Sequence, residues 1–331
     1  PCKEISADWA AQRIKGLSLS SAIWNALFKP KASGGKDKVI KTLIDSFRYP
    51  KRGPGLMWET CRDKCVDMGV QVEMNCGVKG VHQQDGKWSI TTTDGRSFEG
   101  FDHVLSSAPI RELIPSIQPQ LEANGYQAAQ KLGYRDFLTV VLICKDEDAF
   151  DDNWIYIHDP SVKVGRIQNF KSWSPYMVPD PAMACYGLEY FCFEGDGLWT
   201  SKDEDLIALA TKEMVQIGLT KASAVVDGYV VRQPKAYPVY DHTYKENVEA
   251  IREALKPYPG IYLMGRNGMH KYNNQDHSMM TAMLAAKNII AGQELYDVWN
   301  VNEDAEYHEG GLRGEEETQK VVGRMVPKRV Q

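Results

Sequence analysis

The sequence lacks long apolar runs and any excess of positive charge. None of its apolar runs approaches the ~20 residues that a membrane-spanning helix needs. Its 39 Lys and Arg residues stand against 44 Asp and Glu residues, whereas the binding of nucleic acid needs a basic face. We therefore expect a protein with no membrane span and no nucleic-acid partner.

Cysteine is neither abundant nor regularly spaced. The seven cysteines are scattered and odd in number, which indicates reduced thiols rather than a disulfide framework. Residues 1–15 have no apolar core segment of a signal peptide, and we expect a cytoplasmic protein. Cys61 and Cys65 are four residues apart, but no second Cys/His pair has ligand spacing. We interpret both as buried thiols and predict no metal site.

Hydrophobic periodicity divides the chain into interleaved helices and strands. Apolar residues at helical spacing predict helices over residues 5–28, 39–47, 56–68, 121–132, 203–219, 247–255 and 278–290. Alternating or short apolar runs predict strands over residues 70–75, 78–84, 87–95, 103–109, 137–144, 153–158, 163–170, 183–193, 224–234 and 260–265. The Asp85-Gly86 and Asp94-Gly95 pairs predict hairpin turns in a small antiparallel meander. This order of elements indicates an α/β layer with a second α+β domain.

A dense polar segment precedes the last predicted helix. Arg266 and the run from His270 to His277 lie between the apolar strand GIYLMG and that helix. The first N–H groups of a helix lack intrahelical partners and carry about half a positive charge, so a helix start suits an anion or a carbonyl edge. Gly265 lets a ligand approach the backbone closely. We interpret the segment as one side of a ligand crevice at the carboxyl end of a strand. The alternative is a solvated loop with Asn274 or Asp276 as an ordinary N-cap.

The segment GIYLMGRNGMHKYNNQDHSMMTAMLAAKNI resembles the C-terminal FAD-binding segment of the flavin amine-oxidase superfamily. Within that superfamily it is most similar to the protoporphyrinogen-oxidase-like and UDP-galactopyranose-mutase-like branch. Other stretches that agree with this branch are ISADWAAQRIKGL, GVQVEMNCGVKGV, FDHVLSSAPI and KAYPVYD. The resemblance covers most of residues 4–300. It implies an FAD-dependent oxidoreductase whose fold is the C-terminal part of a two-domain, Rossmann-like FAD-binding fold.

The resemblance has one gap, because such proteins begin with a strand and a G-x-G-x-x-G loop that holds the FAD pyrophosphate. This chain has no such loop, and GGLRGEE near Gly310 lacks both the spacing and a preceding strand. The chain also begins with Pro1 and Cys2, and not with Met. We expect a fragment without the N-terminal pyrophosphate-binding half, or a second chain that supplies that half.

The resemblance also implies a division of the chain into five parts. Residues 1–55 would be a helical segment of the substrate domain, and residues 56–112 an FAD-binding part with the β-meander. Residues 113–240 would form a mixed substrate domain, residues 241–300 the C-terminal FAD-binding segment, and residues 301–331 a charged, loosely ordered tail.

The same resemblance assigns cofactor contacts to particular residues. Val78 would offer backbone groups to the adenine, and Ala108 and Pro109 would pass near the ribityl or pyrophosphate portion. Gly265 and Arg266 would lie at the diphosphate and ribityl. Along the flavin it would place Asn274, Gln275 and Asp276, with the N–H groups of His277, Ser278, Met279 and Met280 at the pyrimidine carbonyl edge.

Substrate contacts are expected mainly in the middle of the chain. Residues 153–179 combine aromatic rings with Lys163, Arg166 and Lys171, which suits a flat ring compound or a sugar nucleotide with acidic groups. The alternative is that the rings are sheet core and the lysines a solvated face. The candidate substrate contacts are Arg166, Trp173, Tyr237 and Tyr272. No catalytic side chain is assigned, because flavin carries the electron chemistry itself.

Three classes of function follow. The first is an FAD-dependent oxidoreductase, which we favour. The second is a flavin-dependent isomerase of the UDP-galactopyranose mutase type, because the eukaryotic mutases resemble the pattern Arg266, Tyr272, Asn274 to His277. In those mutases the arginine and tyrosine bind substrate phosphates, but this chain is about two residues shorter after the tyrosine. The third is a cofactor-free binding module, since the pyrophosphate loop is missing. The substrate, the electron acceptor and the oligomeric state stay open.

Overall fold

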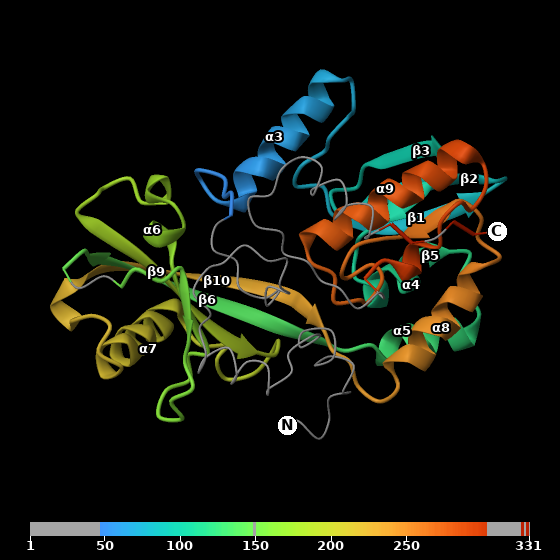
Figure 1. Cartoon of the computed structure of the whole chain (residues 1–331). Coiled ribbons are helices and arrows are strands. Elements are labelled where there is room, and N and C mark those ends of the chain that lie inside the picture. Colours follow the sequence, from blue (N-terminus) through green and yellow to red (C-terminus); the bar gives the residue numbers. More distant parts are fainter. Residues whose placement is uncertain (1–46, 148–149, 303–325, 328, 331) are drawn as a thin grey trace, which may run out of the picture. The chain divides into compact units, whose positions relative to one another are not determined.

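The structure is a computed structural model that describes residues 47–147, 150–302, 326–327 and 329–330 (Figure 1). Two compact units divide the chain. One contains Gly77–Gly133 and the chain from Pro238 onward, and the other contains Tyr49–Cys76 and Tyr134–Tyr237. No helix in the described ranges is long and apolar enough to cross a membrane. The interleaved helices and sheets confirm the predicted α/β with α+β fold class.

The first unit contains the predicted meander. Its sheet has the order β3-β2-β1-β5, with antiparallel pairs β1/β2 and β2/β3 and a parallel pair β1/β5. Asp85 and Gly86 connect β1 to β2 with φ angles of 50° and 75°, as a tight hairpin turn requires. The strands are β1 (Val78–Gln84), β2 (Lys87–Thr92), β3 (Ser97–Phe101) and β5 (Ile117–Gln118).

A separate two-stranded sheet lies in the same unit. Strands β4 (Val104–Ser106) and β11 (Ile261–Leu263) pair in parallel, with Val104 opposite Ile261. The sequence placed residues 103–109 within the meander, and the structure corrects this, because β4 pairs with a strand over 150 residues later. Sequence periodicity does not contain that pairing.

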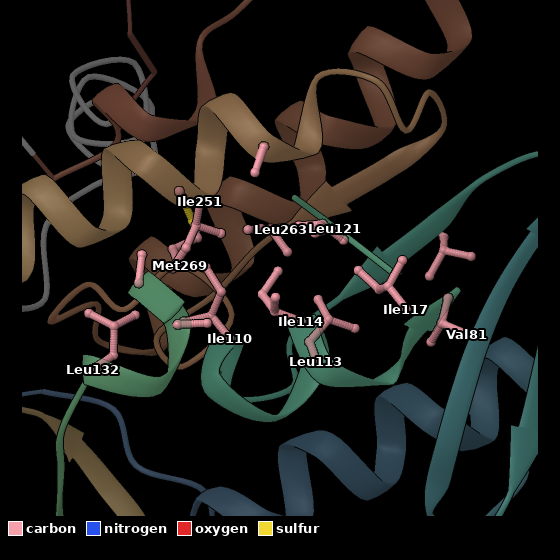
Figure 2. Packing of buried hydrophobic residues seen from close by; sticks show 14 of the residues in the cluster. Val81, Ile110, Leu113, Ile114, Ile117, Leu121, Leu132, Ile251, Leu263 and Met269 are labelled. Carbon is pink, nitrogen blue, oxygen red and sulfur yellow. The ribbon is translucent and has the colours of Figure 1, made fainter. Parts of the chain in front are cut away.

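Helices cover these strands and enclose the core of the first unit. Figure 2 shows Ile110, Ile114 and Ile117, all fully buried, facing Ile251 and Leu263. A Cβ at Gly125 would lie 2.3 Å from that of Ala254, so α5 and α8 cross in close contact. The helices of this unit are α4 (Ile110–Ser116), α5 (Ala123–Lys131), α8 (Tyr244–Leu255), α9 (Gln275–Ala291) and the short 3-10 helix η4 (Val298–Asn300).

The second unit is built on a five-stranded sheet of order β10-β6-β9-β8-β7. The long pair β6/β9 is antiparallel from Asp136 opposite Cys192 to Lys145 opposite Met183. Residues of β6 alternate between buried and half-buried, so one face is core and the other is partly open. The strands are β6 (Tyr134–Lys145), β7 (Trp154–Tyr156), β8 (Arg166–Asn169), β9 (Met183–Cys192) and β10 (Val225–Pro238).

One helix covers the core face of this sheet. Leu206, Ala210 and Met214 of α7 are buried in a cluster with Leu138, Val140 and other residues of the sheet, and Figure 1 shows α7 beside these strands. The other helices of the unit are α3 (Pro54–Asp67), α6 (Phe170–Trp173) and the 3-10 helices η2 (Pro175–Met177) and η3 (Ala222–Ala224).

Three expectations differ from the structure in residues 49–76. Helix α3 groups with the second unit, whereas the sequence placed it with the meander. Residues 70–75 form no strand, because no described strand pairs with them and isolated strands are unstable. Cys61 is exposed and Cys65 half-buried, so the interpretation as buried thiols was wrong. The predicted helix over residues 5–28 and the charged tail after Asn302 lie outside the described residues, as does the predicted helix over residues 39–47 except for Phe47.

Candidate active site

The carboxyl ends of β4 and β11 lie at the same edge of their parallel sheet. The N–H of Met264 donates to the carbonyl of Ser106 at 3.0 Å, which extends the pairing by one residue. At the next residue, Gly265 has a φ angle of 77°. A Cβ there would lie 3.8 Å from the Cβ of Ser107 and 3.9 Å from that of Ser278. Three segments therefore converge at Gly265: the turns after both strands and the start of α9.

Arg266 holds the loop that follows. Its Nε donates to the carbonyl of Asn273 at 2.7 Å and its Nη2 donates to Oδ1 of Asn274 at 3.3 Å. The guanidinium carbon also lies 4.9 Å from the centre of the Tyr272 ring. The resemblance placed Arg266 at the diphosphate and ribityl of the cofactor, and that role stays a prediction. In the structure its side chain supports the loop from Tyr272 to Asn274.

The rest of the loop is tied to distant parts of the unit. Buried Asn273 donates from Nδ2 to the carbonyl of Gly265 at 3.1 Å. The N–H of Tyr272 donates to the hydroxyl of Tyr240 at 2.7 Å, and Lys271 donates to the carbonyl of Trp299. These three residues thus stabilise the conformation of the loop, and only the rest of the polar segment is available to a ligand.

The start of α9 provides that available part. The first helical hydrogen bond runs from the N–H of Ser278 to the carbonyl of Asn274 at 2.9 Å. Asn274 is the N-cap residue but makes no side-chain cap among the described residues, because its Oδ1 accepts from Arg266. The N–H of His277 donates to Oδ1 of Asp276 at 2.8 Å. The N–H groups of Gln275 and Asp276 are therefore the ones that a ligand can reach.

This geometry corrects one expectation. The sequence placed the helix start at Ser278 and assigned the N–H groups of His277, Ser278, Met279 and Met280 to the ligand. The helix begins three residues earlier, at Gln275, so the N–H groups from Ser278 onward lie within the hydrogen bonding of the helix. The positive helix end is at Gln275 and Asp276 instead. His277 and Met280 are buried, whereas Gln275 and Met279 are exposed.

The remaining cofactor candidates lie in the first unit. Ala108 is exposed in the turn after β4, and its N–H donates to Oγ of Ser106 at 3.3 Å. Pro109 is the N-cap of α4. Val78 is exposed at the start of β1. Ala108 and Pro109 directly follow Ser107, which lies beside Gly265, and the cofactor role of Val78 stays a prediction.

His270 is a buried support of the loop that the sequence did not single out. Its Nε2 lies 3.1 Å from the carbonyl of Val239, and its ring lies near the stacked pair of Tyr240 and Tyr244. Burial lowers the pKa of His270 to about 4, against a smaller opposing effect of the Val239 carbonyl and Asp241. The ring is therefore neutral in the folded protein at neutral pH.

This burial predicts a pH dependence of stability. The unfolded state takes up a proton near pH 6.5, but folded His270 does so only near pH 4. Stability from this group is therefore present above pH 6.5 and is lost as the pH falls toward 4. We expect the free energy of unfolding to fall by about 2 kcal/mol between pH 7 and pH 5 through His270. Denaturant unfolding of His270→Asn should lack this component, and His103→Asn should retain it.

The substrate candidates of the second unit each contact other residues of that unit. Arg166 forms an ion pair with buried Glu189, which also accepts from Gln168. Trp173 is stacked between Tyr49 and Trp154, with ring centroids 4.9 and 4.8 Å away.

The third candidate of this unit is Tyr237, whose ring lies 6.3 Å from that of Phe191. Tyr272 belongs to the other unit. Arg166 therefore has a fixed carboxylate partner. Glu189 was missed in the sequence, because it is one acidic residue inside an apolar strand.

No group of three or more His, Cys, Asp or Glu side chains in the described ranges could hold a metal ion. Cys61 and Cys65 are close enough for the neighbouring Cys61 to raise the pKa of Cys65, after the larger effect of desolvation. A pair of thiols falls short of the four ligands of a structural zinc site.

The model of the family of flavin-containing amine oxidoreductases matches residues 13–290. The chain belongs to this family. Flavin is the cofactor of the family, and the assignment agrees with the resemblance seen in the sequence. No curated protein matches the sequence.

Two solved structures share the fold of this chain. A reduced UDP-galactopyranose mutase superimposes with a TM-score of 0.71 at 19% identity over 92% of this chain and 65% of its own. A putative protoporphyrinogen oxidase from Exiguobacterium sp. 255-15 superimposes with a TM-score of 0.55 at 17% identity over 71% of this chain and 51% of its own. The chain thus spans between half and two thirds of the length of these proteins.

The convergence at Gly265 is compatible with a bound flavin nucleotide. A side chain at this position would fill the space between Ser107 and Ser278, so the glycine leaves room for a ligand against the backbone. The N–H groups at the start of α9 face an electron-rich edge favourably. Exposed Ser107 and Ala108 border the same turn. The residues present therefore suit the cofactor of the family.

Proposed function

We propose that this chain is the part of an FAD-dependent oxidoreductase that holds the flavin edge and the substrate. The observation that supports this most is the convergence of the turns after β4 and β11 with the start of α9 at Gly265. Open α/β folds bind ligands at such strand ends, and the family match covers the same segments.

The residues would divide the work as follows. Bound flavin supplies the acceptor for a hydride from the substrate. Gly265 and Ser107 leave space for the cofactor, and the N–H groups of Gln275 and Asp276 offer positive charge to its carbonyl edge. Arg266 and His270 hold the loop in place from behind.

The half-exposed sheet face of the second unit is the proposed substrate surface. Its aromatic rings include Trp154, Tyr156 and Tyr237, which suit a flat or ring-containing molecule. The charge of Arg166 is already matched by Glu189, so this arginine would orient a substrate by hydrogen bonds more than by net charge.

Two substitutions test the cofactor site. Arg266→Ala removes two hydrogen bonds and a ring contact from the loop, and Asp276→Ala removes the carboxylate at the helix start. We expect each to weaken flavin binding by tenfold to a hundredfold, because each loses a charge-assisted hydrogen bond that holds the loop or the helix start in place, worth about 1.5–3 kcal/mol. Flavin titration followed by absorbance would measure this in the longest form of the protein that binds FAD. Arg62→Ala and Asp63→Ala, an exposed pair on α3, are the matched controls. Full flavin content in both site variants would contradict the assignment.

The flavin spectrum tests the function as a whole. We expect the 331-residue chain to lose FAD on purification, because it lacks a pyrophosphate loop, and a form extended at the N-terminus to retain it. Anaerobic incubation of the extended form with candidate reductants should bleach the oxidised flavin. A chain that retains stoichiometric FAD by itself would refute the expected boundary, and an extended form without flavin would favour the binding-module hypothesis.

The second candidate function is a flavin-dependent isomerase of the mutase type. The superposition with a reduced UDP-galactopyranose mutase over 92% of the chain favours it. Against it, Arg266 is bound to Asn273 and Asn274 and stacks on Tyr272, which leaves it poorly placed to clamp a diphosphate. The test is product analysis, because dithionite-reduced protein with UDP-galactofuranose would yield UDP-galactopyranose only if the isomerase hypothesis is correct.

A further inference from the structure

The half-exposed face of the second unit contains Arg135, which has no carboxylate partner among the residues that the structure describes. Arg135 lies on β6, two residues before Phe137 and on the same side of the strand. Its guanidinium carbon lies 5.7 Å from the ring centre of Phe191 and 5.2 Å from that of Phe193. Both rings are large exposed hydrophobic groups, at 43% and 49% exposure. A cation is therefore held over a partly open aromatic surface.

The hydrogen bonding of Arg135 is incomplete. Its Nε is buried and has no hydrogen-bond partner among the described residues, whereas the residue as a whole is half-buried. The cation–π contacts fix the plane of the guanidinium but satisfy none of its five N–H donors. The two terminal nitrogens can thus donate together to a planar acidic group.

Other cations of the same unit differ in this respect. Arg166 pairs with Glu189, Lys171 with Asp146, and Arg232 with Asp203. No such ion pair involves Arg135 within the described part of the chain. Its charge is therefore one that an acidic ligand would neutralise.

The surroundings of Arg135 are fixed by a buried carboxylate. Oδ1 of Asp136 accepts from the N–H of Lys235 at 2.7 Å, and Oδ2 accepts from the N–H of Glu194. Asp136 thereby joins β6 to the segment after β9, next to Phe193, and to β10, two residues before Tyr237. Asp136 is buried, and each of its carboxylate oxygens accepts a backbone N–H. It therefore fixes the backbone near Phe193 and Tyr237 and does not neutralise the charge of Arg135.

An aromatic wall continues from this frame along the sheet. The ring of Phe137 lies 6.0 Å from that of Phe191 and 6.2 Å from that of Tyr237, and the latter pair is nearly perpendicular at 82°. A ligand with its acidic group at Arg135 would have an apolar or aromatic part beside these rings.

We propose that Arg135 binds the acidic group of a ligand whose apolar ring packs against Phe137, Phe191 and Tyr237. The ligand class is an aromatic or other ring-containing molecule with a carboxylate or a phosphate a few atoms from the ring. This rests on the proposed function only in that such a ligand would be the substrate of the oxidoreductase. The binding site itself uses residues of the second unit alone.

The test compares an acid with its neutral isostere. Ligand-observed NMR titration of the 331-residue chain would use 3-phenylpropionate, 3-phenylpropanamide and phenyl phosphate, without added flavin. We expect the wild type to bind the acid at least tenfold more tightly than the amide, since charge-assisted hydrogen bonds are about twice as strong as neutral ones. Phenyl phosphate binding more tightly than the carboxylate would indicate a phosphate-bearing ligand, and the reverse order a carboxylic acid.

Variants separate Arg135 from the rest of the surface. Arg135→Gln should reduce the preference for the acid to within twofold, while Arg62→Gln on α3 should leave it unchanged. Phe193→Ala should weaken the acid and the amide alike. Arg135→Lys retains the charge but loses the planar fork, and an intermediate preference is expected.

Several outcomes would overturn the proposal. Equal affinity of the wild type for acid and amide would do so, as would a preference that survives in Arg135→Gln. If Arg135→Gln does not fold, as judged by thermal unfolding, the wild-type comparison and Arg135→Lys still decide. Because no flavin is present, an acid preference in a protein that never binds FAD would remove the oxidoreductase proposal and leave this site standing. Flavin reduction without an acid preference would do the opposite.

Discussion

Replacing Glu189 with alanine is expected to lower the free energy of unfolding by about 3 kcal/mol. The Glu189 side chain is only 1% exposed, and it accepts from both Arg166 and Gln168. Removing one member of a buried pair leaves the other charge uncompensated, which costs about 3–5 kcal/mol. The Arg166 side chain is 25% exposed and can turn partly toward water, so the lower end of this range applies.

Denaturant unfolding of four proteins would measure this effect. Glu189→Ala should be the least stable, and Arg166→Gln should also be destabilised, because Glu189 then has only Gln168 as a donor. The double variant Glu189→Ala with Arg166→Gln removes both charges and closes the double-mutant cycle. It should recover at least half of the loss, because neither buried charge remains. A double variant as unstable as the sum of the single ones would show that the two side chains act independently.

The pair also shows why the sequence could not give the charge of this face. Residues 163–171 contain Lys163, Arg166 and Lys171 and no acidic residue, so by themselves they suit a substrate with acidic groups. Its partner comes from β9, 23 residues later, and faces it only through the β8/β9 register. Lys171 of α6 also pairs with a carboxylate that is distant in the sequence, that of Asp146. A charge pattern along the chain cannot give net charge on a sheet face, since neighbours across strands decide it.

The fold was most predictable where local signals are strong. The Asp85-Gly86 hairpin, β6 with its strict alternation and the long apolar helix α9 follow from turn chemistry and periodicity. Helix α4 was missed, since it contains Pro115 and only seven residues. The segment at 70–75 has strand composition but no described neighbour that would pair with it. Residues 70–75 thus show that a pairing partner, and not strand propensity alone, decides whether a segment forms a strand.

The candidate site shows a similar limit. The sequence located the polar segment correctly, at the end of a strand and the start of a helix. It did not separate supporting residues from available ones, because the partners of the former are far away: Tyr240 for Tyr272, Trp299 for Lys271 and Thr281 for Gly265. A polar residue in such a segment can therefore support the fold of the loop instead of contacting a ligand. The cofactor roles of Gln275 and Asp276 stay predictions.

Replacing Gly268 with alanine is expected to lower the free energy of unfolding by at least about 3 kcal/mol. A Cβ at this position would lie 2.4 Å from the carbonyl oxygen of Met264, 2.6 Å from that of Ser106 and 3.1 Å from the Cα of Ser107. All three atoms belong to the backbone of β4, β11 and their turns, so no side chain can rotate away. Overpacking of a core usually costs about 1–3 kcal/mol, and contact with fixed backbone places this site at or above that range.

The same substitution would open the candidate site, because Ser107 and Gly265 belong to the two turns that must separate to admit the methyl group. Thermal and denaturant unfolding of Gly268→Ala should therefore show a large loss of stability. Gly133→Ala is the matched control in the same unit, since its nearest new contact is the Cβ of Val239 at 3.6 Å, an ordinary van der Waals distance. A Gly268→Ala protein as stable as this control would mean that β4 and β11 do not approach each other as closely as the structure places them, and the convergence at Gly265 would have to be abandoned.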